Sequence, residues 1–141
     1  MEFKLQILHG YEGYKKTSLM RKLVFEQEQG FVDDGDEHDG ESIHMIMVEG
    51  EEAVASGRMY IEHPGVYHLG RIVVVKLRRG QGYGQTLVKQ LVMYARNQQA
   101  QQCVLSSQLH ACAFYERLGF SKSGDVYDEQ GQPHQWMIKF L

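Results

Sequence analysis

The sequence predicts one α/β domain, of the α+β kind, in which about four helices flank a central mixed, mostly antiparallel sheet of about six to seven strands. Three observations lead to this prediction. The chain has 141 residues, of which 43% are hydrophobic and 23% charged, and this fits a single compact core over residues 1–141. Runs rich in Val, Ile, Met and Tyr follow one another over residues 43–75, as in a meander of strands. A glycine-rich loop then separates the last run from a helical pattern.

The first predicted elements are a short half-buried strand and a helix. Apolar residues alternate with polar ones in the strand, namely Phe3, Leu5 and Ile7. Apolar residues at helical spacing follow, namely Leu19, Met20, Leu23 and Val24, and Gly30 ends that segment. The polar stretch 33–40 is predicted to be a loop. Its glycines and acids are out of register with a calcium-binding loop, so no metal site is expected there.

The remaining elements are punctuated by glycine and proline. The meander strands, separated by turn residues at 50–52 and 64–65, are predicted over residues 43–49, 53–61 and 66–75. Next come a helix over residues 87–95 and a buried strand over 102–107. A short helix over 111–118, closed by Gly119, and a hairpin of residues 120–127 with 134–141 follow. The hairpin turn is predicted at Gly131-Gln132-Pro133.

Composition excludes several classes of function. The formal net charge of −3 argues against a nucleic-acid partner. No stretch approaches the roughly 18 apolar residues of a membrane span, and the N-terminus lacks the apolar core of a signal peptide, so we expect a cytoplasmic protein. Cys103 and Cys112 are too few for a disulfide framework or a four-ligand zinc site. We therefore expect both cysteines to be small packed residues.

The charges are unevenly distributed along the chain. Residues 26–52 contain eleven acids and no Lys or Arg. Residues 63–115 contain no Asp or Glu but six cations, namely Arg71, Lys76, Arg78, Arg79, Lys89 and Arg96. A folded region with uncompensated cations attracts a small polyanion, although a solvated surface without a ligand is the alternative.

The glycine loop Arg79-Gly80-Gln81-Gly82-Tyr83-Gly84 comes between a strand and a helix. The start of a helix presents backbone N–H groups that lack internal partners, and glycines let an anion approach them. A P-loop is excluded because no Gly-Lys-Ser/Thr follows. A dinucleotide fingerprint is excluded because the glycines have the wrong spacing and because no acid follows about 20 residues after the loop, the next one being Glu116.

The same loop resembles the pyrophosphate loop of the GNAT acyltransferases, with its signature Arg/Gln-x-x-Gly-x-Gly/Ala. About 35 residues downstream, and across one strand, Phe114-Tyr115-Glu116-Arg117-Leu118-Gly119-Phe120 is similar to a second motif of that family. Further segments resemble the small bacterial ElaA-like branch, namely Arg21 to Gly30, Asp36 to Asp39, Ile43-His44 and Gly131 to His134. The resemblance covers nearly the entire chain and implies the GNAT fold.

The resemblance implies acetyl-CoA as cosubstrate. We expect the backbone N–H groups of the loop to bind its pyrophosphate, and Lys76, Arg78 and Arg79 to add positive charge. The loop residues concerned are Arg79, Gly80, Gln81, Gly82, Tyr83 and Gly84. In the family the pantetheine lies along the preceding strand, which here assigns its main-chain contacts to Val73, Val74 and Val75. Gln108 takes the position at which many members use Asn to contact the cofactor.

The resemblance also implies catalytic roles. Tyr115 matches the general acid of the family, and the amide of Val74 or Val75 would face the thioester oxygen. His134, at the start of the last strand, is the expected base, because a histidine side chain can accept a proton near neutral pH. Glu28, His44 or a chain of waters are the alternatives. His110, just before a helix, is expected to be a cap or a packed residue.

The expected reaction is direct attack by a primary amine of a small molecule or peptide on acetyl-CoA in a ternary complex. The candidate acceptor-binding residues are Arg21, Lys22, Glu28 and His44. A non-catalytic CoA-binding sensor or interaction module is the alternative function. The protein is expected to be a monomer or homodimer with no nucleic-acid or membrane partner.

Overall fold

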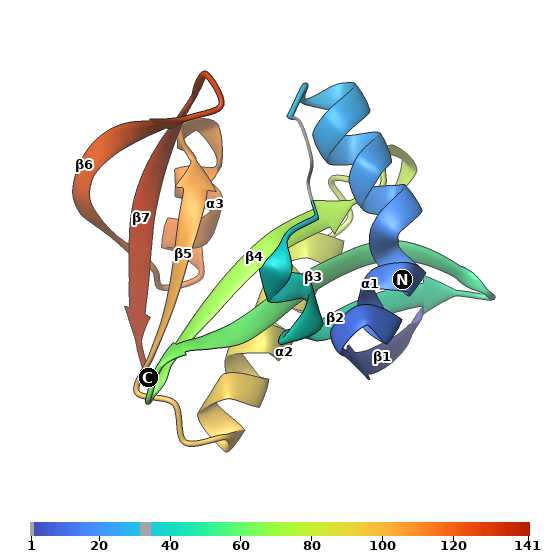
Figure 1. Ribbon diagram of the computed structural model, residues 1–141, viewed down its shortest axis with the longest axis horizontal. Coiled ribbons are helices and arrows are strands. Elements are labelled where there is room, and N and C mark those ends of the chain that lie inside the picture. The colour runs from blue at the N-terminus through green and yellow to red at the C-terminus, as the bar shows by residue number, and fades with distance from the viewer. Residues whose placement is uncertain (1, 32–34) are drawn as a thin grey trace.

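The computed structural model describes residues 2–31 and 35–141, and within them a sheet of seven strands has the order β1-β2-β3-β4-β5-β7-β6 (Figure 1). The strands are β1 (Lys4–His9), β2 (Ile43–Glu49), β3 (Glu52–His63), β4 (Val66–Val74), β5 (Gln102–Gln108), β6 (Ser121–Glu129) and β7 (Gln132–Phe140). The α-helices of the described residues are α1 (Gly10–Arg21), α2 (Tyr83–Asn97) and α3 (Cys112–Arg117). The predicted mixed α/β sheet is confirmed, with three α-helices instead of about four.

The sheet opens between β4 and β5. These strands are parallel and pair only from Val66 with Gln102 to His68 with Val104; all other neighbouring strands are antiparallel. β4 carries an extra residue opposite β3 near Arg71, whose φ is +50°, and such a bulge bends a strand. Beyond His68 the two strands diverge, as Figure 1 shows. The β5-facing edge of β4 is therefore left without a partner strand.

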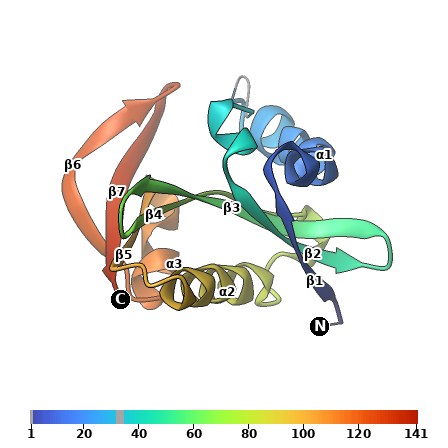
Figure 2. The same cartoon turned by 60° about the horizontal axis from the view of Figure 1, so that its bottom comes forward.

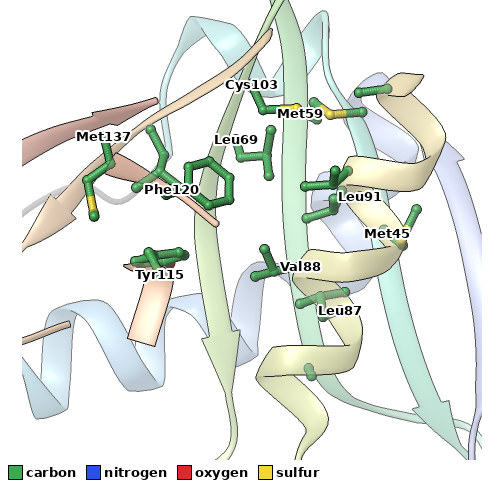
Figure 3. Packing of buried hydrophobic residues seen from close by; sticks show 14 of the residues in the cluster. Met45, Met59, Leu69, Leu87, Val88, Leu91, Cys103, Tyr115, Phe120 and Met137 are labelled. Carbon is green, nitrogen blue, oxygen red and sulfur yellow. The ribbon is translucent and has the colours of Figure 1, made fainter. Parts of the chain in front are cut away.

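The main core lies between the sheet and α2 with α3. Leu87, Val88 and Leu91 of α2 are fully buried against residues of the sheet such as Met59 and Leu69 (Figure 3). Gly57 allows the close approach, because a Cβ there would lie 2.6 Å from Ile72 Cδ1 and 2.9 Å from Leu91 Cδ1. Figure 2 shows α2 and α3 on one face of the sheet and α1 on the other. The hydrophobic core thus fixes the positions of the strands on either side of the β4–β5 opening.

The apolar pattern of the first helical segment marked its buried face only in part. Met20 and Val24 are buried, as their spacing indicated, but Leu19 and Leu23 are 84% and 46% exposed, and the buried Thr17 was not expected. Gly13 sets the contact, since a Cβ there would lie 2.4 Å from the His44 ring. The packing stripe contains a glycine, a threonine and an arginine, so an apolar pattern could not reveal all of it. A π-helical segment, Lys22–Glu28, continues the helix.

Two smaller expectations were also wrong. Leu5 and Ile7 of β1 are 37% and 40% exposed, because β1 is an edge strand of the sheet. The β6–β7 turn consists of Gln130 and Gly131, both with positive φ, and Pro133 belongs to β7. Two central residues with positive φ make the tight turn that suits a hairpin.

The acidic segment contains structure that the loop prediction missed. Residues 37–40 form a single 3-10 turn capped by Asp36, while Asp33 and Asp34 lie outside the described residues. Asp39 is 1% exposed and binds Arg21 (Oδ1 to Nη1, 2.6 Å) and Arg58 (3.0 Å). Asp36 binds Arg58 through both oxygens (2.5 and 2.8 Å) and Arg71 (3.2 Å). This charge network connects α1 and β3 to the bulge of β4.

Asp39→Asn is expected to destabilise the protein by about 3–5 kcal/mol, since it removes a carboxylate from between two buried guanidinium groups. Burial raises the pKa of Asp39, but hydrogen bonds from Arg21 and the Asp36 amide, with the charges of Arg21 and Arg58, lower it to about 2. A lowered pKa gives stability that is present above the ordinary value of 3.8 and is lost as the pH falls towards 2. Urea unfolding at several pH values measures both effects.

The charge-matched control is Asp125→Asn, at an exposed position on β6, which is expected to leave the free energy of unfolding nearly unchanged. If Asp39→Asn were as mild as this control at pH 7, the network would not contribute to stability.

Candidate active site

A cavity of about 280 Å³ occupies the opening between β4 and β5. Residues 69–72 of β4 and 105–108 of β5 form two of its walls. Phe25, Gln29 and Phe31, which follow α1, form a third. The remaining lining residues come from the segment before α3, from α3 itself and from the β6–β7 hairpin, namely His110, Ala111, Tyr115, Glu129, Gln130 and His134. The structure thus brings Gln108, Tyr115 and His134, three of the residues expected at the site, together at one cavity.

The glycine loop lies at the start of α2, next to the free edge of β4. Gly80 and Gly82 have φ of +75° and +88°, and Gly82 is the N-cap of α2 without a side-chain cap. Within the described chain, the backbone N–H groups of residues 80–85 have no hydrogen-bond acceptor. A Cβ on Gly84 would lie 3.4 Å from the Phe114 ring and 3.6 Å from Val74. The loop is exposed, so its donors are open to an anion.

The side chains beside the loop are more occupied than predicted. Arg78 binds Glu49 through two hydrogen bonds of 2.8 Å, and the Tyr83 hydroxyl donates to the same carboxylate. The hydrogen bonds from Arg78 and Tyr83 lower the pKa of Glu49 to about 2. The side chains of Arg78 and the buried Tyr83 therefore anchor the loop to β2. Lys76 is exposed and, among the described residues, has no ion pair.

Arg79 extends along the edge of β4. Its Nε donates to the carbonyl oxygen of Val74 (2.9 Å), and its Nη1 lies 2.9 Å from Glu28 Oε1. Glu28 ends the π-helical segment. This arrangement links the segment after α1 to the edge of β4 through one guanidinium group.

Val73, Val74 and Val75, at the end of β4 and just after it, differ in where their main-chain and side-chain groups point. Val75 N–H donates to Val54 O (2.9 Å) and is used by β3. Successive backbone groups of an antiparallel strand point to opposite sides, so the N–H of Val74 points to the open edge. The side chain of Val73 is buried against Met20 and Val24. Of the two amides proposed to face a thioester, only that of Val74 is directed at the opening.

Tyr115 projects from the short helix α3 into the cavity wall. Its ring packs edge-to-face on Phe114 and Phe120, with centroids 5.0 and 5.9 Å apart. Its hydroxyl makes no hydrogen bond within the described residues, and burial raises its pKa above that of an ordinary tyrosine. The group therefore keeps its proton at neutral pH and can donate it.

His134 lies on β7 directly opposite Gln108 of β5 and is 4% exposed. Its Nδ1 is 3.0 Å from the Gln132 carbonyl oxygen, and its Nε2 is 3.1 Å from Glu129 Oε2. Glu129 was not predicted. Hairpin pairing was the available signal, because it places Glu129 opposite Gln132, two residues before His134.

The other polar residues at the cavity are held by each other. Gln108 Nε2 donates to Gln29 Oε1 (2.8 Å), and its Oε1 accepts from His110 Nε2 (2.9 Å). His110 is consequently tied to Gln108 and does not cap the following helix, which has no side-chain cap.

Two of the four predicted acceptor-binding residues are buried away from the cavity. Arg21 and His44 are each 1% exposed, and His44 Nε2 donates to the Asp39 carbonyl (3.1 Å). Burial lowers the pKa of His44, so it stays neutral at pH 7. Both residues belong to the buried network around Asp39. Lys22 is exposed on the helical segment after α1, and Glu28 is engaged by Arg79.

Neither a metal centre nor a membrane span is found in the part of the chain that the structure describes. No group of three or more His, Cys, Asp or Glu side chains there could hold a metal ion. No helix there is long and apolar enough to cross a membrane. Cys103 and Cys112 are both free and buried.

Comparison with known proteins adds an independent line of information. Residues 7–120 match the acetyltransferase (GNAT) family. The chain is 32% identical over 139 residues to the uncharacterized N-acetyltransferase YjcF of Bacillus subtilis, covering 96% of this chain and 99% of that one. It is 31% identical over 121 residues to protein ElaA of Escherichia coli, covering 83% and 79%.

Solved structures agree with the sequence comparison. The crystal structure of E. coli ElaA superposes with a TM-score of 0.88 at 26% identity, covering 98% of this chain and 99% of that one. An acyl-CoA N-acyltransferase from Pseudomonas aeruginosa gives a TM-score of 0.87 at 25% identity, with the same coverage.

Proposed function

Because this chain belongs to the acetyltransferase (GNAT) family, it is an acyltransferase with acetyl-CoA as cosubstrate, and we propose that it acetylates a primary amine of a small molecule or peptide. The amine attacks directly, with both substrates bound at once. The observation that supports this proposal is the juxtaposition, in one cavity, of Tyr115, His134 and the unpaired edge of β4.

The residues of the opening fit acetyl-CoA. The N–H groups of residues 80–85 would hold the pyrophosphate, with Lys76 adding charge. A side chain at Gly84 would fill the space between the loop, Phe114 and Val74. When bound, acetyl-CoA supplies an acyl group activated as a thioester. Along the free edge of β4, Val74 offers main-chain hydrogen bonds to the pantetheine, whereas the main-chain groups of Val73, like those of Val75, point towards β3.

Val74 N–H is the proposed donor to the carbonyl oxygen of the acyl group. A donor of this kind, fixed in place before the reaction, contributes roughly 3–4 kcal/mol when it is aimed at developing negative charge. Since it is a backbone group, alanine substitution cannot remove it.

Two side chains are proposed to move protons. Tyr115 Oη holds a proton at the cavity wall and gives it to the departing thiolate, which leaves as the thiol. His134 takes a proton from the ammonium form of the acceptor at Nε2. The two residues approach from α3 and β7, on the β5 side of the opening.

Thiol release from acetyl-CoA with a panel of amines tests the proposal. We expect release that depends on the amine and saturates with both substrates, and initial-rate lines that intersect. Tight acetyl-CoA binding without turnover on any amine would instead support a non-catalytic CoA-binding module.

Glu28→Gln is expected to tighten acetyl-CoA binding by about two- to fivefold. Glu28 holds Arg79 over the edge of β4, and an exposed ion pair of this kind is worth about 0.2–1 kcal/mol. Without the carboxylate, Arg79 is released towards the phosphates. Isothermal titration measures the change, with Glu12→Gln, at an exposed position in the first turn of α1, as control. Weaker binding in the Glu28 variant would show that the ion pair holds the site in its binding conformation.

A further inference from the structure

We infer that Glu129 and His134 together form the subsite for the ammonium group of the acceptor, and that Glu129 selects cationic amines without a neighbouring carboxylate. This inference rests on the proposed function and names its substrate class. Glu129 is then a specificity-determining residue of the reaction.

The hydrogen bonds of His134 fix where its proton lies. Nδ1 is 3.0 Å from the carbonyl oxygen of Gln132, and a carbonyl oxygen only accepts, so Nδ1 carries the hydrogen. The neutral ring therefore has its lone pair on Nε2. That atom faces Glu129 Oε2 at 3.1 Å, and an ionised carboxylate also only accepts.

Two acceptors at hydrogen-bond distance require a shared donor. A primary ammonium group meets this need, because it has three N–H donors and can give one to Glu129 and one to Nε2. The positive charge then lies beside the carboxylate.

The same arrangement prepares the acceptor for attack. One N–H bond of the ammonium group breaks and the proton moves to Nε2, while the electron pair stays on the amine nitrogen. Glu129 stabilises the imidazolium that results. Tyr115 lines the same cavity from α3.

Glu129 is 52% exposed, and few other charged side chains line the cavity around the pair. Among the described residues that line the cavity, Glu129 is the one carboxylate, and the titratable or charged residues of the other elements are Arg71, His110 and Tyr115. Arg71 is bound to Asp36, and His110 donates to Gln108. On β6 the Tyr127 ring lies 6.0 Å from the His134 ring.

The acceptor class follows from the electrostatics and the walls. A carboxylate on the carbon next to the amine would be brought against Glu129, and like charges in contact disfavour binding. Phe31 packs edge-to-face on the His134 ring, with centroids 6.0 Å apart, and Phe25 lines the cavity near it. Alkyl, aralkyl and polyamine acceptors are therefore preferred to amino acids. Phenethylamine and phenylalanine, or tyramine and tyrosine, are matched probes of this preference.

The test compares Glu129→Gln with the wild-type protein on each amine of the panel that reacts. We expect the KM for the amine to rise about tenfold or more, the KM for acetyl-CoA to stay the same, and Glu129→Asp to restore part of the amine affinity. The wild-type preference for phenethylamine over phenylalanine should shrink in Glu129→Gln. Asp125→Asn, an exposed position on the same strand, is the charge-matched control and should behave as wild type.

The outcomes separate this inference from the proposed function. If the wild-type protein binds acetyl-CoA but acetylates no amine, both fall. If it acetylates amines and folded Glu129→Gln has the same amine KM and the same preference, only the ammonium subsite is wrong. An equal rise in the KM values for amine and acetyl-CoA would also overturn it, because that pattern indicates a distorted hairpin.

Discussion

Gly82→Val is expected to weaken acetyl-CoA binding by a factor of at least about 10². Gly82 has φ +88° at the N-cap of α2, a conformation that a β-branched residue adopts only with strain. The loop must change shape, and the N–H groups of residues 80–85 then no longer point together. Each hydrogen bond to a charged group is worth about 1.5–3 kcal/mol, so losing two of them accounts for the factor. Isothermal titration with acetyl-CoA measures it.

Gly124→Val is the matched control. Gly124 also has positive φ, +74°, on the edge strand β6, and a Cβ there meets nothing within 4 Å. This variant suffers similar backbone strain at a residue that neither lines the cavity nor adjoins the glycine loop, so it should lose stability but keep its affinity for acetyl-CoA. A folded Gly82→Val protein with wild-type affinity would show that the loop does not hold the pyrophosphate.

Tyr115→Phe is expected to lower turnover by about 10²-fold with both substrates saturating. The phenylalanine ring keeps the edge-to-face contacts with Phe114 and Phe120, so the melting temperature should change little. The KM values should also change little, because the hydroxyl acts on the leaving group. Steady-state kinetics on a reacting amine measures the effect.

The pH dependence of turnover is a second test of Tyr115. Burial raises the pKa of its hydroxyl above 10, the ordinary value for tyrosine. The hydroxyl of the wild-type enzyme should therefore stay protonated, and turnover should not fall through its loss, as the pH passes 10. Tyr94→Phe, on α2, serves as a control with the same chemical change. Unchanged turnover in Tyr115→Phe would remove this residue from the mechanism.

The parts of the fold with a regular pattern could be predicted from the sequence. The strands of residues 43–75 were predicted because runs rich in Val, Ile, Met and Tyr are separated by turn residues, and the helix after the glycine loop because its apolar residues recur at helical spacing. The glycine loop was predicted because its glycines stand just ahead of that helix, and Gly80 and Gly82 have positive φ in the structure. The face of α1 could be predicted only in part, because Gly13 and Thr17 make its contact with the sheet.

Residues that belong to local sequence motifs could be assigned to the site from the sequence. Contacts between residues from different elements could not. Tyr115 and His134 lie at the cavity, as their motifs indicated. Arg21 and His44 were expected to contact the acceptor, but Asp39 draws both into a buried network. Arg21 and Asp39 are 18 residues apart in sequence, and no spacing rule gives such a pairing. Glu129 was missed because its role depends on the orientation of a hairpin.

The amide chemical shifts of the ¹⁵N-labelled protein, measured during a titration with coenzyme A, test the central claim most directly. They report on backbone groups that no side-chain substitution can remove. The account predicts that the largest changes occur at residues 80–85 and at Val74, and that Val75, whose N–H is bound to Val54 O, changes less. Changes confined to other parts of the protein, with residues 80–85 and Val74 unmoved, would contradict it.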